Sequence, residues 1–227
     1  MPTLLAKRAF ALRERMDDPA CDLEKLHNTY AQFQTINGLV AGWRRVYTNF
    51  LRPHLAGQPA TLLDVGCGGG DVARRMANWA ERDKLELHIT AVDPDKRALA
   101  YARSRPHPNI TFRQAHSADL VAAGEQYDVV ISNHLLHHLN NAEVNALCQD
   151  SQRLAKRLAL HNDIRRSDVA YAGFTLTKLF FRNSFITEDG LLSIRRSFVP
   201  EELEAVTPEG WQVERLFPYR NLLIYRA

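Results

Sequence analysis

The chain has 227 residues and a formal net charge of +3, with 45% hydrophobic and 24% charged residues. This length allows one large domain with a sizeable core, and the composition is that of an ordinary soluble globular protein. The small net charge gives no reason to expect a nucleic-acid partner. The sequence has no apolar run of about 18 residues, so we expect no membrane span, and its N-terminus lacks the apolar core of a secretory signal.

The cysteines and the arginine pairs are scattered. Cys21, Cys67 and Cys148 are far apart and odd in number, which favours neither a disulfide framework nor a zinc site. A reducing compartment, the cytoplasm, is therefore the expected location. The arginine pairs form no single basic run and are expected to lie on solvated faces.

Residues 3–56 carry almost no strand signal. Between residues 21 and 51, apolar side chains recur at spacings of three and four, the pattern of amphipathic helices. We expect two or more helices that break near Asn37–Gly38. Residues 1–56 are thus expected to form an N-terminal helical cover, and residues 57–227 the main domain.

Strand and helix patterns then alternate as far as residue 163. Short apolar runs predict strands over 60–66, 85–94, 109–116, 127–133 and 157–163, with helices over 71–83, 95–105 and 141–156. Continuous apolar strands that alternate with helices predict a parallel sheet covered on both faces, and right-handed connections make it doubly wound. Ligands of such sheets bind at the carboxyl ends of the strands.

The tail has a different pattern. An aromatic-rich segment over 167–185 predicts one helix or two short helices, and Pro200 begins another helix. Two closing strands, over 211–217 and 221–227, are joined so closely that they are expected to be antiparallel. The fold class is therefore α/β, with a mostly parallel seven-stranded sheet, an antiparallel C-terminal hairpin and a helical insertion at about residues 165–195.

Glycines gather where the first expected strand meets the next helix. Four of the eleven glycines lie between Gly66 and Gly70. The stretch fits both G-x-G-x-G, from Gly66, and the dinucleotide frame G-x-G-x-x-A, from Gly68. Asp64 in the strand before them favours a ligand ammonium over a pyrophosphate, because a buried carboxylate needs a partner. Asp93, at the end of the second expected strand, stands where an acid accepts hydrogen bonds from ribose hydroxyls.

Three stretches, "LLDVGCGGG", "AVDPD" and "YDVVISNHLLHHL", resemble motifs of class I S-adenosylmethionine-dependent methyltransferases, and the C-terminal sequence resembles the closing helix and hairpin of that family. The resemblance implies a Rossmann-like methyltransferase fold and S-adenosylmethionine as cofactor, with S-adenosylhomocysteine as product. It also implies cofactor-site roles for Asp64, Gly66, Cys67, Gly68, Asp93, Pro94, Ser117, Ala118 and Asn133, with Arg44 or Arg45 for the cofactor carboxylate. Relatives often have an acid before the Ser117–Ala118 pair; here that residue is His116, so either Asp119 substitutes or backbone alone meets the adenine.

The expected catalytic residues are His134, His137 and His138, whose spacing can place them on adjacent helix faces. Three interpretations stay open: a structural role, a general base or substrate contact, and a metal site. We expect no metal, because no carboxylate or cysteine completes a site locally. The "LHHL" pair resembles one in methyltransferases that act on small molecules, and it slightly favours His137 as the base.

The acceptor is expected to be a small or lipophilic molecule, such as a phenolic, quinol or polyketide-like metabolite with a hydroxyl or activated ring carbon. The sequence Ser132–Leu135 lacks the tetrad typical of methylation on DNA or amide nitrogen. Arg165 and Arg166 are candidates to grip an acidic group. The aromatic residues that could roof an apolar pocket are Tyr30, Phe33, Trp43, Tyr171, Phe174, Phe180, Phe181 and Phe185.

Two alternatives come from other functional classes. The Gly68–Ala73 frame allows an NAD-dependent oxidoreductase, and a non-catalytic cofactor-binding partner subunit would need the same loop. The sequence indicates no oligomeric state.

Overall fold

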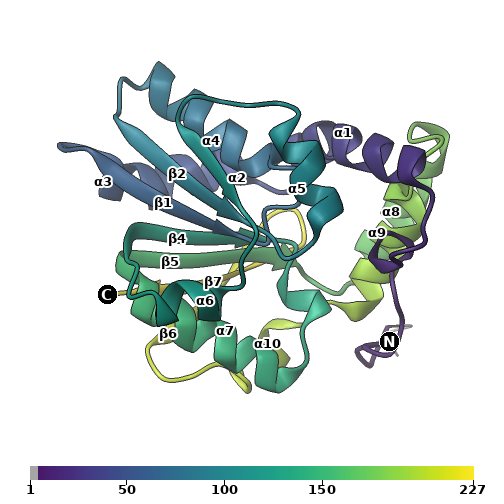
Figure 1. The fold of residues 1–227 in the computed structure, drawn as a ribbon. Coiled ribbons are helices and arrows are strands. Elements are labelled where there is room, and N and C mark those ends of the chain that lie inside the picture. Colours follow the sequence, from purple (N-terminus) through teal and green to yellow (C-terminus); the bar gives the residue numbers. More distant parts are fainter. Residues whose placement is uncertain (1–4) are drawn as a thin grey trace.

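A computed structural model describes residues 5–227 as an α/β fold around one seven-stranded sheet with the strand order β3-β2-β1-β4-β5-β7-β6 (Figure 1). β1 to β5 are parallel, and β7 is antiparallel to both β5 and β6. The predicted doubly wound sheet with an antiparallel C-terminal hairpin is therefore confirmed. The strands are β1 (Ala60–Val65), β2 (Leu87–Val92), β3 (Ile110–Arg113), β4 (Tyr127–Asn133), β5 (Ala155–Ile164), β6 (Trp211–Leu216) and β7 (Arg220–Arg226).

Helices lie on both faces of the sheet and beyond its carboxyl edge. Those before β1 are η1 (Arg15–Asp17), α1 (Leu23–Val40), α2 (Trp43–Val46), the π-helical turn η2 (Tyr47–Leu51) and α3 (Arg52–Leu55). Those between the parallel strands are α4 (Asp71–Arg82), α5 (Lys96–Arg103), α6 (Ser117–Ala122), η3 (Leu136–His138) and α7 (Asn141–Leu154). Those between β5 and β6 are α8 (Asp168–Phe174), η4 (Thr175–Leu179), α9 (Ile186–Arg196) and α10 (Pro200–Glu204).

Two hydrophobic cores follow from the two-residue period of the strands. Leu62 and Val129 face a core shared with α2, α3 and α4, whereas Leu63 and Val130 face a core shared with α6, α7 and α10. Because both faces of the central strands are covered, their sequences are continuously apolar. This burial fixes the carboxyl ends of β1, β2, β4 and β5 along one edge.

The edge strand β3 is shorter than its expected range. It pairs only with β2, over Ile110 to Arg113, and α6 begins soon afterwards at Ser117. The backbone N–H of His116 donates to the Asp119 carboxylate at 2.8 Å, which completes the cap of α6. This capping turn takes the chain out of the sheet before residue 116.

The helical break expected at Asn37–Gly38 is wrong. α1 runs through Gly38, where a Cβ atom would lie 2.8 Å from the Arg75 guanidinium, so glycine allows close packing there. The break occurs at Gly42, whose φ of 66° lies in the left-handed region that favours glycine.

The helix expected from residue 3 onward is absent over most of residues 5–20, so this expectation is also wrong. Residues 3 and 4 lie outside the described residues. Residues 5–22, called the N-terminal segment below, contain only the short turn η1. The segment runs beside α8 and α9 (Figure 1), and its backbone bonds to α9: Ala9 N donates to Arg195 O at 2.9 Å, and Arg15 N donates to Asp189 Oδ1 at 2.7 Å. These contacts replace helical hydrogen bonds. Over residues 5–227, no helix combines the length and apolarity that a membrane crossing requires.

Candidate functional site

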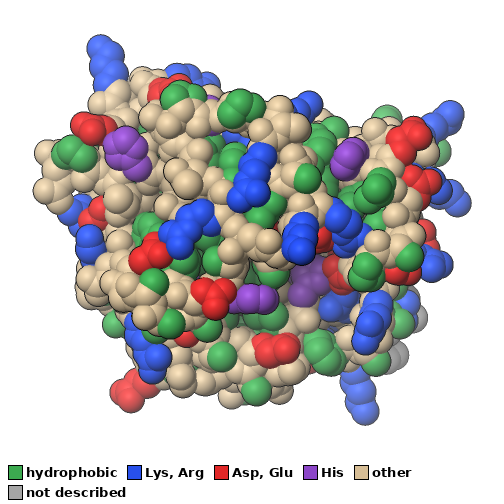
Figure 2. Space-filling view, viewed as in Figure 1, with side chains coloured by type: hydrophobic (Ala, Val, Ile, Leu, Met, Phe, Trp, Pro, Cys, Tyr) green, Lys and Arg blue, Asp and Glu red, His purple; other side chains and the backbone are tan. Residues whose placement is uncertain are grey.

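A cavity of about 660 Å³ lies at the carboxyl ends of the strands, within the size range of small-molecule sites. The N-terminal segment, α1, α8 and α9 contribute to its walls, together with the ends of β1, β2 and β4. Histidine side chains are visible at a hollow in this face of the molecule, and lysine and arginine are spread among acidic side chains (Figure 2). The cavity has two ends, defined below by their residues.

The glycine-loop end consists of Asp64, Gly66, Cys67, Gly68 and Asp93, all of which line the cavity. Gly66 and Gly68 have φ values of 69° and 52°, so the loop needs the left-handed conformation at both. Gly66 N and Cys67 N donate to the carbonyl of Val92 at 2.8 and 3.0 Å, which ties the loop to β2. A Cβ atom on Gly68 would meet nothing closer than a Tyr30 ring atom at 4.0 Å, so bare backbone faces open space here.

Asp64 is a buried carboxylate at the end of β1. It is 1% exposed, and neither oxygen receives a well-formed hydrogen bond from the described residues. Burial raises its pKa well above the usual range, and the nearby carboxylates of Asp71 and Asp93 add to this effect. Such a group is costly without a partner, and a ligand ammonium in the cavity would supply one.

Asp93 connects the loop to the end of β2. Its Oδ2 accepts from Gly68 N at 2.8 Å, and its Oδ1 accepts from Asp95 N at 2.8 Å. Burial raises the pKa of Asp93, although the two backbone hydrogen bonds oppose this. Pro94 and Asp95 also line the cavity, and Asp95 caps α5.

The structure does not bring every expected cofactor residue to the cavity. Ser117 and Ala118 are not among its lining residues, and Ser117 Oγ donates to the Asp150 carboxylate at 2.6 Å. Asp119 caps α6 and is not among the lining residues, so it is left out of the proposed cofactor site. The Arg44 guanidinium lies over the rings of Tyr47 and Trp79, and Arg45 is also outside the cavity. Arg44 and Arg45 are therefore left out of the proposed cofactor site.

The histidine end consists of Glu14, His134, His137 and His138, which line the other side of the cavity. The three histidines are not on one α-helix as expected. His134 has a φ of 56° and forms a turn, and His137 and His138 belong to the 3₁₀ helix η3. The rings still gather, with centroids 6.1 Å apart for His134–His137 and 4.3 Å for His137–His138.

His134 is held neutral beside a buried arginine. Its Nε2 accepts from Arg220 Nη1 at 2.6 Å, so the ring proton is placed on Nδ1. Burial and Arg220 lower the pKa of His134 well below its usual value. Arg220 also donates to Asn133 Oδ1 at 3.1 Å, and both residues line the cavity. His134 is therefore a neutral imidazole whose Nε2 is already occupied by Arg220.

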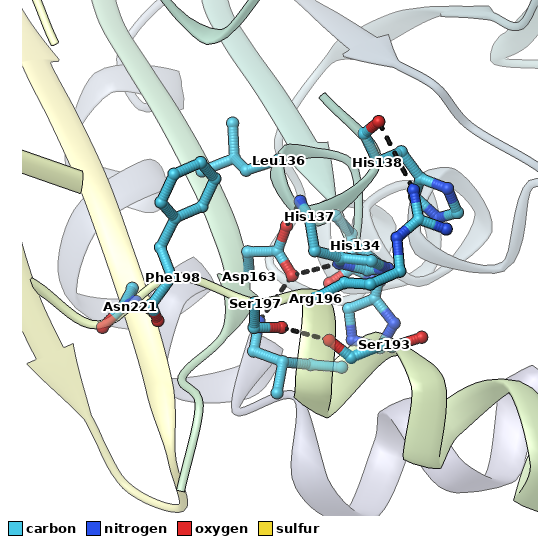
Figure 3. A network of polar contacts seen from close by, with 12 residues as sticks. His134, Leu136, His137, His138, Asp163, Ser193, Arg196, Ser197, Phe198 and Asn221 are labelled. Atoms are coloured by element: carbon cyan, nitrogen blue, oxygen red, sulfur yellow. Dashed lines mark hydrogen bonds and ion pairs between the residues drawn. The ribbon is translucent and has the colours of Figure 1, made fainter. Parts of the chain in front are cut away.

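His137 lies between two carboxylates. Asp163 Oδ1 is 2.7 Å from Nδ1, and Glu14 Oε1 is 3.3 Å from Nε2 (Figure 3 shows the Asp163 side). Burial alone would lower the pKa of His137, but Asp163 and Glu14 outweigh it and raise the pKa to about 9. Burial would raise the pKa of Asp163, but His137 and Arg220 hold it well below its usual range. His137 is thus protonated near neutral pH, and Asp163 fixes its orientation.

His138 and Glu14 complete this end. The His138 side chain is 26% exposed; its Nε2 is 3.7 Å from Glu14 Oε2, and its Nδ1 is 3.3 Å from Asp17 Oδ2. Glu14 is buried and also accepts from Ser193 Oγ at 2.8 Å. Burial would raise the pKa of Glu14, but the two histidines lower it.

Sequence reasoning missed Glu14, Asp189 and Arg220. Glu14 lies in a charged stretch with no motif, and only the fold of the N-terminal segment brings it to η3. Burial raises the pKa of Asp189, a cavity residue of α9, to about 6. Arg220 lies just after the hairpin turn that joins the closing strands, and nothing in that turn signals a ligand site.

The expected arginine clamp is wrong. Arg166 binds Glu202 at 2.6 Å and donates to the carbonyls of Leu5 and Ser197, so it joins the N-terminal segment to the main fold. Arg165 lies over the Tyr219 ring. Neither lines the cavity. Of the aromatic candidates, Tyr30, Phe33 and Phe174 line it; Trp43, Tyr171, Phe180, Phe181 and Phe185 do not.

Comparisons with known proteins identify the central domain and the fold. Residues 62–157 match the family model described as a methyltransferase domain. A ubiquinone biosynthesis O-methyltransferase of Cereibacter sphaeroides is 33% identical over 85 residues, which cover 36% of this chain and only 32% of that relative. The chain thus matches about a third of this curated relative's length.

Solved structures show the same fold. The human N-acetylserotonin methyltransferase, solved with S-adenosylmethionine, superposes with a TM-score of 0.61 at 15% identity, over 90% of this chain and 56% of that one. The plantazolicin methyltransferase BpumL, solved with S-adenosylhomocysteine, superposes with a TM-score of 0.57 at 13% identity, over 89% of this chain and 95% of that one. The chain therefore contains a class I S-adenosylmethionine-dependent methyltransferase domain.

Proposed function

We propose that the chain transfers a methyl group from S-adenosylmethionine to a small or lipophilic acceptor that carries a hydroxyl group or an activated ring carbon. One observation carries this proposal: a single cavity joins the glycine-loop end, suited to the methyl donor, to the histidine end, suited to an acceptor. The reaction is an in-line displacement at a sulfonium methyl, so alignment of the two substrates supplies much of the acceleration.

At the glycine-loop end, the proposed roles follow from the contacts. The backbone of Gly66, Cys67 and Gly68 meets the methionine part of the cofactor. Asp64 binds its ammonium group, since this carboxylate has no well-formed hydrogen bond of its own. Asp93, which the loop already orients, accepts from the ribose hydroxyls. Pro94 packs against the adenine, and Asn133 lies beside the methionine part.

At the histidine end, apolar side chains and titratable groups meet. Phe33, Val40, Val169, Phe174 and Ile194 line the cavity and suit an apolar acceptor. A phenol gains about 10²–10⁴-fold from a base, and the Glu14 carboxylate with His138 is the group that can take the proton. His137 orients Glu14, and the neutral His134 lies beside His137.

The acceptor class also draws on relatives, whose names include ubiquinone biosynthesis and N-acetylserotonin methyltransferases. Residues 1–56 are proposed as a cover and 165–195 as an insertion that together close the acceptor side. Their described parts support this, because the N-terminal segment, α1, α8 and α9 all contribute to the cavity.

The test is mass spectrometry of a metabolite extract incubated with the protein and S-adenosylmethionine that carries a deuterated methyl group. We expect a mass shift in a phenolic or quinol-like metabolite that is lost in Asp93→Ala and kept in Glu209→Ala, an exposed control. A shift found only in RNA would contradict the acceptor class. Binding of NAD without binding of S-adenosylhomocysteine would replace the proposal by an oxidoreductase, and cofactor binding without any transfer would indicate a partner subunit.

A further inference from the structure

We propose that Glu14, His137 and His138 form a binding site for one divalent transition-metal ion, of which zinc is the type. Each residue offers one ligand atom, and these atoms all lie within 4.8 Å of one another. Two imidazoles and a carboxylate are a common ligand set for zinc and related ions. Glu14 supplies the carboxylate that the sequence around the histidines lacks.

The separations between the ligand atoms are compatible with a metal ion, and each ring lies near a different oxygen of the Glu14 carboxylate. Bonds of about 2.0–2.2 Å at tetrahedral angles place neighbouring ligand atoms about 3.4 Å apart. Glu14 Oε1 and His137 Nε2 are 3.3 Å apart, and Glu14 Oε2 and His138 Nε2 are 3.7 Å apart. Hydrogen bonds from nitrogen to oxygen have lengths of about 2.7–3.2 Å, so both separations are long for direct bonds. His137 would have to release its Nε2 proton to bind an ion, because a histidine binds a metal through an unprotonated ring nitrogen.

The residues behind the ligands orient them as in known metal sites. His137 Nδ1 is 2.7 Å from the Asp163 carboxylate (Figure 3), which leaves Nε2 on the side of Glu14, 3.3 Å from Oε1. A carboxylate behind a histidine ligand fixes the ring and increases its basicity. Ser193 Oγ donates to Glu14 Oε1 at 2.8 Å and fixes the third ligand.

Asp163, Glu14 and Asp17 surround the two rings. Arg196 is the guanidinium paired with this group, and its Nη1 is closer to Asp17, at 3.5 Å, than to Glu14, at 3.8 Å. Asp17 is therefore the carboxylate nearer to Arg196, whereas Glu14 is the carboxylate that lies close to Nε2 of both rings.

The site faces the cavity, so protein does not enclose it fully. All three ligand residues line the cavity, and the His138 side chain is 26% exposed. Three protein ligands with an open side leave room for water or for an oxygen of the acceptor. The proposed function does not require the ion. With the ion bound, Glu14 and His138 would act as ligands instead of as the base, so this inference rests on the proposed function only for a role in binding the acceptor.

The experiment measures metal binding directly in the full chain after treatment with a chelator. Zn²⁺ affinity is measured by competition with a chromophoric chelator, and Co²⁺ is added to read coordination geometry from its visible absorption. We expect one ion per chain and the Co²⁺ spectrum of a four- or five-coordinate site without thiolate ligands. Affinity should fall by about 100-fold or more in His138→Ala and Glu14→Gln, and by about 10–100-fold in Asp163→Asn.

Controls separate this inference from the proposed function and from misfolding. His88→Gln changes an exposed histidine on β2 and should bind the ion as the unmodified chain does. Binding of S-adenosylhomocysteine by each variant reports an intact fold and glycine-loop end. If the folded chain binds S-adenosylhomocysteine but no ion, or binds an ion that His138→Ala leaves unchanged, the metal site is wrong. Thiolate absorption from Co²⁺ would place the ion at a cysteine and also overturn it.

Discussion

The two ends of the cavity are assembled in different ways. The glycine-loop end comes from residues 64–68 and 93, which two adjacent strands carry to one edge, and its geometry depends on backbone hydrogen bonds within this unit. The histidine end combines residue 14, residues 134–138 and residue 163, and it exists only because the N-terminal segment bonds to α9 and η3. A local motif thus makes one end, whereas long-range packing makes the other. Variants should separate them.

The largest expected effect comes from Glu14→Gln, which changes the histidine end alone. Removing the carboxylate that receives the acceptor proton should lower methyl transfer by about 10²–10⁴-fold. The dissociation constant of S-adenosylhomocysteine should stay within about 2-fold, because Glu14 does not belong to the glycine-loop end. Single-turnover kinetics and calorimetric titration measure the two quantities. Equal losses in both would show that the ends are not separable.

Asp93→Ala is expected to impair the glycine-loop end and to leave the histidine end unchanged. It removes the acceptor of the ribose hydroxyls and the hydrogen bonds from Gly68 N and Asp95 N. Each bond to a charged group contributes about 1.5–3 kcal/mol, so S-adenosylhomocysteine should bind about 100-fold more weakly. Asp119→Ala is the matched control, since that acid caps a helix outside the cavity. Unchanged affinity in Asp93→Ala would contradict the assigned cofactor end.

The stability of the sheet that joins the two ends should depend on pH through His161. This buried ring lies with Nδ1 2.7 Å from Ser132 Oγ, and burial lowers its pKa to about 4. Because the unfolded chain binds the proton more tightly, the contribution to stability is present above pH about 6.5 and is lost as pH falls toward 4.

Denaturant unfolding of the unmodified chain and of His161→Gln at pH 7 and pH 4.5 checks this. The free energy of unfolding should fall by roughly 3 kcal/mol more in the unmodified chain than in the variant, an upper estimate from the pKa shift. His88→Gln, at an exposed site, should behave as the unmodified chain. Equal pH dependence in all three proteins would show that His161 does not titrate as described.

The smallest expected effects distinguish two glycines of the loop. In Gly68→Ala the new methyl group faces open space, so the left-handed φ of 52° should cost about 1–2 kcal/mol and weaken cofactor binding about 10-fold. In Gly70→Ala the methyl group would lie 2.7 Å from Phe112, so stability should fall more than cofactor affinity does. Thermal unfolding and S-adenosylhomocysteine titration measure both. The reverse order would place the ligand near Gly70 instead.

The sequence allowed good prediction wherever the signal was local. The strand ranges of the sheet, the glycine loop and Asp93 follow from apolar periodicity and from a motif within about 30 residues, the size of one strand–helix–strand unit. The helical break was misplaced because Gly38 serves close packing against Arg75, whereas Gly42 makes the turn. Propensity alone does not distinguish these two uses of glycine.

The histidine end could be predicted only in part. The three histidines were visible as a cluster, but their charge states depend on partners that no local pattern reveals. Arg220 keeps His134 neutral, whereas Asp163 and Glu14 keep His137 charged. For Arg166 the sequence suggested a ligand-binding role that the residue does not have. Its guanidinium instead holds the N-terminal segment in place. Long-range packing decides both outcomes.

The most direct test of the central claim, that one cavity serves donor and acceptor, is a crystal structure of the protein with S-adenosylhomocysteine. We expect the homocysteine part against Gly66–Gly68, its ammonium at Asp64, the ribose hydroxyls at Asp93, and the sulfur facing Glu14 and His138. A ligand bound elsewhere, or one whose sulfur faces away from the histidine end, would contradict the account.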